Sequence, residues 1–258
     1  MPGQKDVGSL GTEEKFYEWE TINRKMTDKI LEQLQMRRNE EKARILQRFF
    51  KTGPGQYGEG DVFLGITVPA LRKMAAQYQG IALESVLGLI RHPYHEARLL
   101  ALLLMIQSFQ KSDPTVKQTI FDAYLAHTRF INNWDLVDLS APHIVGAYLA
   151  DRNRNILNKL AISKQLWERR IAIVATCHFI REGEFQSTLD ISDLLLPDRE
   201  DLIHKAVGWM LREVGKRDQA LLEGWLKSRY QQMPRTMLRY AIEKFTPQKR
   251  QGYLRGLF

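Results

Sequence analysis

Two tryptophans and one aspartate are the side chains in this sequence best suited to chemistry on a positively charged group. Trp134 and Asp138 are four residues apart, so on a helix they lie on the same face, and Lys205 and Trp209 repeat that spacing. The π face of an indole attracts cations, and a carboxylate stabilises a positive charge that develops during a reaction. A groove that both tryptophans and Asp138 face is therefore suited to a cationic ligand or reaction centre.

Each of these residues also has a purely structural interpretation. A tryptophan is often a core residue, and a carboxylate among arginines can belong to a structural ion pair. Taken singly, Trp134 and Trp209 are best interpreted as core residues. Asp138 and Lys205 occupy matched positions of an internal repeat, and the presence of a tryptophan four residues from each favours a functional role instead.

The spacing of apolar residues predicts helices along most of the chain. Thr27-Asp28 and Asn39-Glu40 are candidate helix starts, and Thr67-Val68-Pro69 is typical of a cap followed by a proline in the first turn. Further helices are predicted at about 83–91, 94–110, 114–127, 134–150, 153–161, 165–182, 186–196, 199–215, 218–230, 234–245 and 247–255. No segment alternates like a strand, so the expected fold class is all-α.

A weak internal repeat runs through these helices. The segments EARLLAL, LVDLSAP, ERRIAIV, HKAVGWM and MLRYAIE align as the second helices of successive pairs. Charged residues then occupy equivalent positions, with spacings of 40, 32, 35 and 34 residues: Arg98, Asp138, Arg170, Lys205 and Arg239. Such periods are typical of HEAT and armadillo solenoids. We therefore expect a HEAT-like α-solenoid of stacked antiparallel helix pairs, whose second helices line a concave basic groove.

The domain organisation is predicted to be simple. Residues 1–25 are polar and contain several glycines, and we interpret them as a flexible N-terminal extension. Residues 26–258 are interpreted as a single HEAT-like repeat domain. The glycine-rich segment 52–61 is interpreted as a connector, because it lacks the GK[ST] ending and the preceding strand of a phosphate-binding P-loop.

Composition indicates a polyanionic partner. The net charge is +8, and residues 199–258 carry 13 Lys and Arg against 6 Asp and Glu, a balance of +7. Such an excess is typical of nucleic-acid binding. The single cysteine, Cys177, excludes an internal disulfide and a cysteine metal cluster, and no apolar stretch is long enough to span a membrane. We expect a soluble cytoplasmic protein with no membrane partner and no metal site.

Several ordered segments also resemble a known family. WDLVD, WERRIAI and HKAVGWMLRE, preceded by FFKTGPGQYGEGDVFLGI, resemble hallmark segments of the AlkD-type alkylpurine DNA glycosylases of the DNA alkylation repair family. The resemblance covers roughly residues 40–245. It implies a HEAT-like fold, no metal or organic cofactor, and release of 3-alkyladenine and 7-alkylguanine from duplex DNA in base excision repair. A monomer is expected.

The resemblance also implies catalytic roles. Trp134 and Asp138 match the aromatic residue and the catalytic carboxylate of the family, and Trp209 matches its second active-site indole. Alkylation at N3 or N7 makes a purine cationic and weakens its glycosidic bond, so no strong general acid is required. An ionised Asp138 would stabilise the positive charge on the sugar and place a water.

Contacts to DNA are implied in the same way. Arg170 matches the family's groove arginine, which would hold a backbone phosphate. Arg98, Lys205 and Arg239 would add backbone contacts that are independent of sequence and weaken with salt. Phe49, with Phe50 as the alternative, is the nearest match to an aromatic residue that relatives place over the lesion.

Three other functions stay open at this point. A non-catalytic HEAT-repeat protein that recognises distorted or branched DNA needs the basic groove but not Asp138, and a lone carboxylate weakens phosphate binding. A protein-interaction scaffold, the usual role of HEAT arrays, predicts apolar or mixed-charge groove residues. A Schiff-base role for Lys205 would add lyase activity, but no feature of the sequence marks this lysine as a nucleophile.

Overall fold

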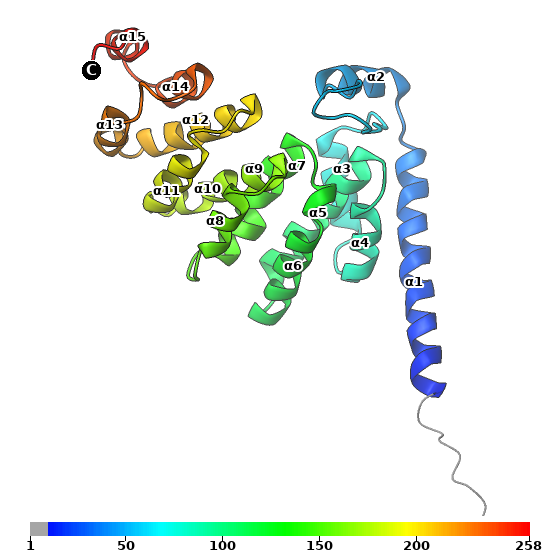
Figure 1. The fold of residues 1–258 in the computed structure, drawn as a ribbon. Helices are drawn as coiled ribbons and strands as arrows, with labels where there is room; N and C mark the ends of the chain where they lie inside the picture. Colours follow the sequence, from blue (N-terminus) through cyan, green and yellow to red (C-terminus); the bar gives the residue numbers. More distant parts are fainter. Residues whose placement is uncertain (1–9) are drawn as a thin grey trace, which may run out of the picture. The chain divides into compact units, whose positions relative to one another are not determined.

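Helices make up nearly all the regular structure in the part of the chain that the structure describes (Figure 1). The computed structural model describes the backbone of residues 10–258 and the side chains from Trp19 onward. Within that range no strand forms, and the single extended pairing is an isolated bridge between Val62 and Tyr94. The all-α prediction is confirmed, and consecutive helices stack as in an α-solenoid.

The chain divides between Lys111 and Ser112 into two compact units. The first unit contains α1 (Leu10–Gln35), α2 (Glu40–Phe49), α3 (Val68–Gln77), α4 (Leu83–Ile90) and α5 (His95–Lys111). The second contains α6 (Pro114–Ala126), η1 (Thr128–Phe130), α7 (Trp134–Ala141), η2 (Pro142–Gly146), α8 (Asn155–Ala161), α9 (Leu166–Ala175), α10 (Cys177–Arg181), α11 (Gln186–Leu195), α12 (Asp201–Gly215), α13 (Gln219–Lys227), α14 (Arg235–Ala241) and α15 (Pro247–Arg255). The single domain predicted for residues 26–258 spans both units and stays a prediction.

The start of the first helix differs from the sequence prediction. The segment predicted as an extension, residues 1–25, is helical from the start of α1, whereas residues 1–9 lie outside the described residues. The predicted cap at Thr27 is wrong, because this residue lies inside α1. Its hydroxyl donates to the carbonyls of Asn23 at 3.0 Å and Ser85 at 3.1 Å. The first bond lies within α1, and the second attaches α1 to α4.

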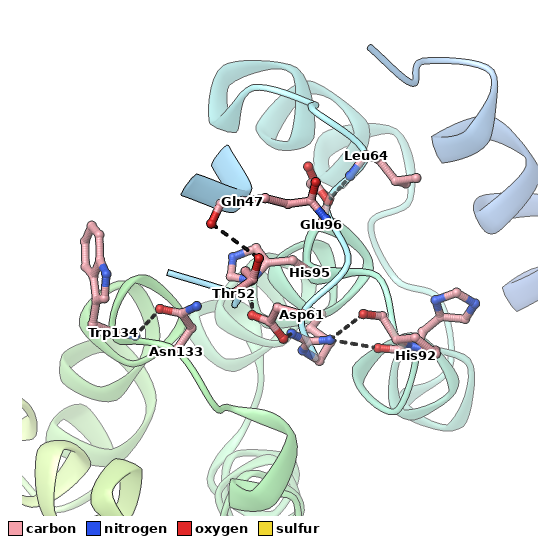
Figure 2. Close-up of polar contacts among 11 residues, drawn as sticks. Gln47, Thr52, Asp61, Leu64, His92, His95, Glu96, Asn133 and Trp134 are labelled. Atoms are coloured by element: carbon pink, nitrogen blue, oxygen red, sulfur yellow. Dashed lines mark hydrogen bonds and ion pairs between the residues drawn. The ribbon is translucent and has the colours of Figure 1, made fainter. Parts of the chain in front are cut away.

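A buried carboxylate fixes the segment that precedes α3. Glu96, in the first turn of α5, is 1% exposed and accepts backbone N–H bonds from Leu64 at 2.8 Å, Gly65 at 2.7 Å and Ile66 at 3.2 Å (Figure 2). Gly65 has a φ of +83°, and a Cβ atom there would lie 2.1 Å from the Asn39 carbonyl oxygen. Backbone donors therefore satisfy the buried charge, and only glycine fits the turn.

Two of the predicted long helices in the second unit are interrupted. The helix predicted at 134–150 gives way after α7 to a π-helical turn, η2, which begins at Pro142. Proline has no N–H to donate to the preceding turn, and a π turn accommodates that loss. The helix predicted at 165–182 divides at Thr176, whose hydroxyl donates to the Ile173 carbonyl at 2.7 Å.

Helices α7, α9, α12 and α14 form a row of neighbours within the second unit (Figure 1). They contain all or most of the last four of the five aligned repeat segments. Gly208 permits a close approach of α12 and α14, because a Cβ atom there would lie 2.5 Å from both the Met237 carbonyl oxygen and the Tyr240 Cβ. The adjacency that the repeat predicts is present in this unit. The HEAT designation and the concave basic groove stay predictions.

Candidate active site

Asp138 and Arg170 form a two-point ion pair between α7 and α9. Arg170 Nε donates to Asp138 Oδ1 at 2.9 Å, and Nη2 donates to Oδ2 at 2.8 Å. The third guanidinium nitrogen, Nη1, donates to the carbonyl of Leu202 on α12 at 2.6 Å. One arginine thus connects three neighbouring helices and fixes the plane of the carboxylate.

Two opposing effects act on the pKa of the Asp138 carboxyl. Burial raises the pKa of the Asp138 carboxyl, while the charge and hydrogen bonds of Arg170 lower it. The Asp138 side chain is 19% exposed, whereas that of Arg170 is 6% exposed. The carboxylate therefore sits at the edge of the protein interior, where a ligand can reach it and where a nearby positive charge is weakly screened by water.

Arg170 lies in a different environment from the one predicted for it. The sequence predicts that Arg170 binds a backbone phosphate of DNA. In the structure its guanidinium faces Asp138 and the Leu202 carbonyl, and the residue is 5% exposed. A guanidinium in this position orients the carboxylate, which is the role that its geometry supports.

The two predicted indoles are half-buried and belong to the same row of helices. Trp134 is the first residue of α7, and its backbone N–H donates to the side-chain oxygen of Asn133 at 2.8 Å (Figure 2). Asn133 is fully buried and caps the helix. Trp209 lies on α12, four residues after Lys205. Neither indole is fully buried, so each retains surface that a ligand can contact.

Two other groups that could act as bases or nucleophiles in this unit are held neutral. Tyr124 is fully buried and its hydroxyl lies 2.9 Å from the Ser140 hydroxyl. Burial raises the pKa of Tyr124, and burial likewise raises the pKa of the Cys177 thiol. A thiol with a raised pKa stays protonated and is a poor nucleophile, so Asp138 is the stronger candidate for chemistry in this unit.

Lys205 and Arg239 line one pocket between α12 and α14. Lys205 Nζ lies 2.7 Å from Asp201 Oδ2, one turn earlier on α12. Two further lining residues, Tyr240 and Arg250, were missed by the sequence reasoning. Tyr240 is adjacent to a repeat position, but Arg250 is on α15, outside the aligned repeats, and no spacing pattern points to it.

Arg98, which the sequence predicts to contact DNA, lies in a buried environment in the structure, and the contact stays a prediction. It belongs to the first unit and is 4% exposed. Its Nη2 atom contacts Asp61, and its Nη1 atom donates to the carbonyls of His92 at 3.1 Å and Pro93 at 2.9 Å (Figure 2). Asp61 also lies 3.1 Å from His95 Nδ1. Arg98 is therefore a structural residue in a buried polar network, not a surface cation.

The two candidate aromatic residues of the first unit, Phe49 and Phe50, differ in exposure. Phe49, at the end of α2, is 61% exposed. Phe50 is 6% exposed and stacks on Phe63, with ring centroids 5.0 Å apart and planes 14° apart. Phe49 is thus the residue available to a ligand, and its contact with DNA stays a prediction.

The described residues contain no group of three His, Cys, Asp or Glu side chains placed to hold a metal ion. None of the helices in the described range is both long and apolar enough to cross a membrane.

The chain is similar to a known family and to solved structures. The model of a family described as DNA alkylation repair enzyme matches residues 30–245, which is most of the chain. Among solved structures, a predicted DNA alkylation repair enzyme from Enterococcus faecalis is similar, with a TM-score of 0.63 and 18% sequence identity over 81% of this chain and 97% of that chain. At that identity the structural likeness concerns the fold alone. No curated protein matches the sequence.

Proposed function

This chain belongs to the DNA alkylation repair enzyme family, and from that membership we propose that it is a monofunctional DNA glycosylase. Its role lies in the repair of alkylation damage, with DNA as the partner. The proposed reaction is hydrolysis of the N-glycosidic bond of cationic alkylated purines, 3-methyladenine and 7-methylguanine, in duplex DNA. This reaction would begin base excision repair.

The observation that carries the proposal is the Asp138–Arg170 pair. A two-point contact holds the carboxylate of the partly exposed Asp138 side chain in a fixed orientation, on the helix that also carries Trp134. A preorganised charge of this kind stabilises an opposite charge that develops in the transition state, without rearranging at the moment of reaction. We assign Asp138 as the catalytic residue and Arg170 as the residue that positions it.

The proposed chemistry needs no acid to activate the leaving group. The bond between the sugar C1′ and purine N9 breaks, and its electron pair neutralises the cationic base. Positive charge develops on the sugar, where Asp138 stabilises it, as a carboxylate does in glycoside hydrolysis. The oxygen of a water oriented by Asp138 forms a bond to C1′, and the proton of that water passes to the carboxylate or to solvent.

The neighbouring residues would supply binding. The π faces of Trp134 and Trp209 attract the cationic base or the charged sugar, each with about 0.5–2 kcal/mol. Lys205 and Arg239 lie on the next helices of the row and would contact backbone phosphates. This division separates lesion recognition, which depends on the indoles, from binding to DNA of any sequence, which depends on the cations.

Base release from methylated duplex DNA tests the proposal. The wild type, Asp138→Asn and Asp190→Asn are compared, with free purine separated by chromatography and duplex binding measured for each protein. Asp190 is the control, because it is an exposed acidic residue of the same unit on another helix, α11. We expect Asp138→Asn to bind duplex DNA but to release base roughly 10²- to 10³-fold more slowly, the range for loss of one preorganised electrostatic group.

Two outcomes would overturn parts of this assignment. Normal release by Asp138→Asn would remove Asp138 from the mechanism. If no protein releases base while salt-sensitive binding to duplex DNA persists, the chain is a non-catalytic DNA-binding protein. In that case distorted or branched DNA becomes the substrate to test.

A further inference from the structure

A charged pocket lies at the C-terminal end of the second unit, beside the proposed active-site row. It has a volume of about 500 Å³ and is lined by side chains from α12, α14 and α15 and from the residues after α14. Its charged and aromatic lining residues are Asp201, Lys205, Arg239, Tyr240, Glu243 and Arg250. A volume of this size falls in the range of small-molecule sites and is larger than a bare phosphate needs.

The two acidic residues of the pocket are already paired with cations. Lys205 Nζ lies 2.7 Å from Asp201 Oδ2. Glu243 contacts the Arg212 guanidinium and lies 3.0 Å from Lys244 Nζ. The hydrogen bond from Lys205 lowers the pKa of Asp201, and the one from Lys244 lowers that of Glu243, so both carboxylates are ionised and matched at neutral pH.

The two arginines of the pocket are not matched in this way. Across the described residues, neither Arg239 nor Arg250 has an acidic partner within ion-pair distance. The Nε atom of Arg250 is shielded from solvent and has no hydrogen-bond acceptor. An N–H donor of a guanidinium group that is removed from water costs free energy if it has no acceptor, and a ligand can supply that acceptor. The surplus positive charge in the pocket therefore calls for an anion with several acceptor oxygens.

We propose that this pocket binds the phosphate group of a nucleotide in DNA, with Arg239 and Arg250 as the donors. Guanidinium groups match phosphate oxygens in geometry and charge better than lysine ammonium groups do. Tyr240 also lines the pocket and is 37% exposed, so its ring offers a face to the sugar or base attached to that phosphate. The choice of DNA as the source of the phosphate rests on the proposed function.

Charge-removing variants on one helix provide a matched test. Arg250→Gln removes a pocket arginine of α15, and Arg255→Gln removes an exposed arginine of the same helix that does not line the pocket. Arg239→Gln is a second pocket variant on the surface of α14, where a folding defect is not expected. Each protein is titrated with an undamaged duplex oligonucleotide at several salt concentrations, and its thermal unfolding is recorded.

We expect both pocket variants to bind the duplex about tenfold more weakly than the wild type, with a salt slope lower by about one, while Arg255→Gln changes much less. If Arg250→Gln and Arg239→Gln bind like Arg255→Gln, the proposal is overturned. Deoxyadenosine monophosphate and inorganic phosphate serve as competitors for the duplex. Weak competition by both supports a backbone phosphate, whereas binding of the monophosphate more tightly than the duplex overturns the assignment to DNA.

The phosphate-binding proposal for the pocket and the glycosylase assignment can be rejected independently of each other. Weakened duplex binding by the pocket variants, in a protein that releases no base, would support the pocket and remove the glycosylase. Normal duplex binding by the pocket variants, in a wild type that releases base, would leave the glycosylase and remove the pocket.

Discussion

Arg170 holds both carboxylate oxygens of Asp138, with donor–acceptor distances of 2.9 Å from Nε and 2.8 Å from Nη2. The two side chains come from helices whose sequence positions differ by 32 residues, one period of the repeat. The arginine is the more buried partner, so the pair is an interior contact with one accessible edge. Its energetic and chemical consequences can be measured apart from base release.

Removal of the arginine should destabilise the fold strongly. Arg170→Met leaves the Asp138 carboxylate without its partner, and loss of one member of a buried pair costs about 3–5 kcal/mol of unfolding free energy. Urea unfolding measures this change. Arg239→Met, which removes an exposed arginine, should change stability by about 0.5 kcal/mol or less. Combining Arg170→Met with Asp138→Leu should recover much of the loss, and strictly additive losses would mean that the two residues do not interact in solution.

The pH dependence of base release should report the charge of Asp138. Burial raises the pKa of this carboxyl above its ordinary value of 3.8, and the active form is the ionised one. The rate should therefore fall as the pH falls through that raised pKa. In Arg170→Lys the two-point contact is lost, so the acidic limb should move to higher pH, after subtraction of uncatalysed release. An acidic limb at the same pH in both proteins would show that another group titrates.

The site was predictable from the sequence where it depends on helix spacing. The four-residue spacing of Trp134 and Asp138 and the repeat period place these residues and Arg170 on neighbouring helices, as the structure does. Periodicity fixes which helices are neighbours and which face each residue occupies. It does not state how deeply a residue is buried, because burial depends on the side chains of other repeats.

Arg98 and Phe49 show that burial does not follow from position in the sequence alone. Arg98 occupies the same repeat position as Lys205, yet it is buried against Asp61 and the carbonyl groups of His92 and Pro93, which come from two separate connections. Phe49 and Phe50 are adjacent in sequence, and only the packing of Phe50 on Phe63 separates the core residue from the surface one. A single sequence contains no signal for either contact.

Trp134 and Trp209 should contribute more to the processing of DNA that carries a cationic base than to the binding of undamaged DNA. Trp134→Leu and Trp209→Leu remove a π face that attracts a cationic base, so release of 7-methylguanine should slow by about 2- to 30-fold per residue, the equivalent of about 0.5–2 kcal/mol. Binding to undamaged duplex should change less, because that DNA carries no cationic base. Trp19→Leu, an exposed indole of α1, is the control and should leave release unchanged. Equal losses for damaged and undamaged DNA would assign the indoles to general DNA binding or to packing.

A methyl group added at Gly208 should show whether the close packing of α12 on α14 or helix propensity has the larger effect on stability. In Gly208→Ala the new Cβ would lie 2.5 Å from the Met237 carbonyl oxygen and the Tyr240 Cβ, so the helices must move apart. We expect a loss of about 1–3 kcal/mol of unfolding free energy, despite the higher helix propensity of alanine. Gly224→Ala, on α13, meets no atom within 4 Å and should instead stabilise by about 0.5–1 kcal/mol.

The same pair of variants bears on DNA binding. Gly208 lies between Lys205 and Trp209 in sequence and packs against Tyr240 of the neighbouring helix, so a shift of α14 away from α12 would also separate Lys205 from Arg239. Duplex binding by Gly208→Ala should therefore weaken at temperatures where the protein is still folded, whereas Gly224→Ala should bind like the wild type. Equal stability and equal binding in the two variants would show that the close contact between α12 and α14 is absent in solution.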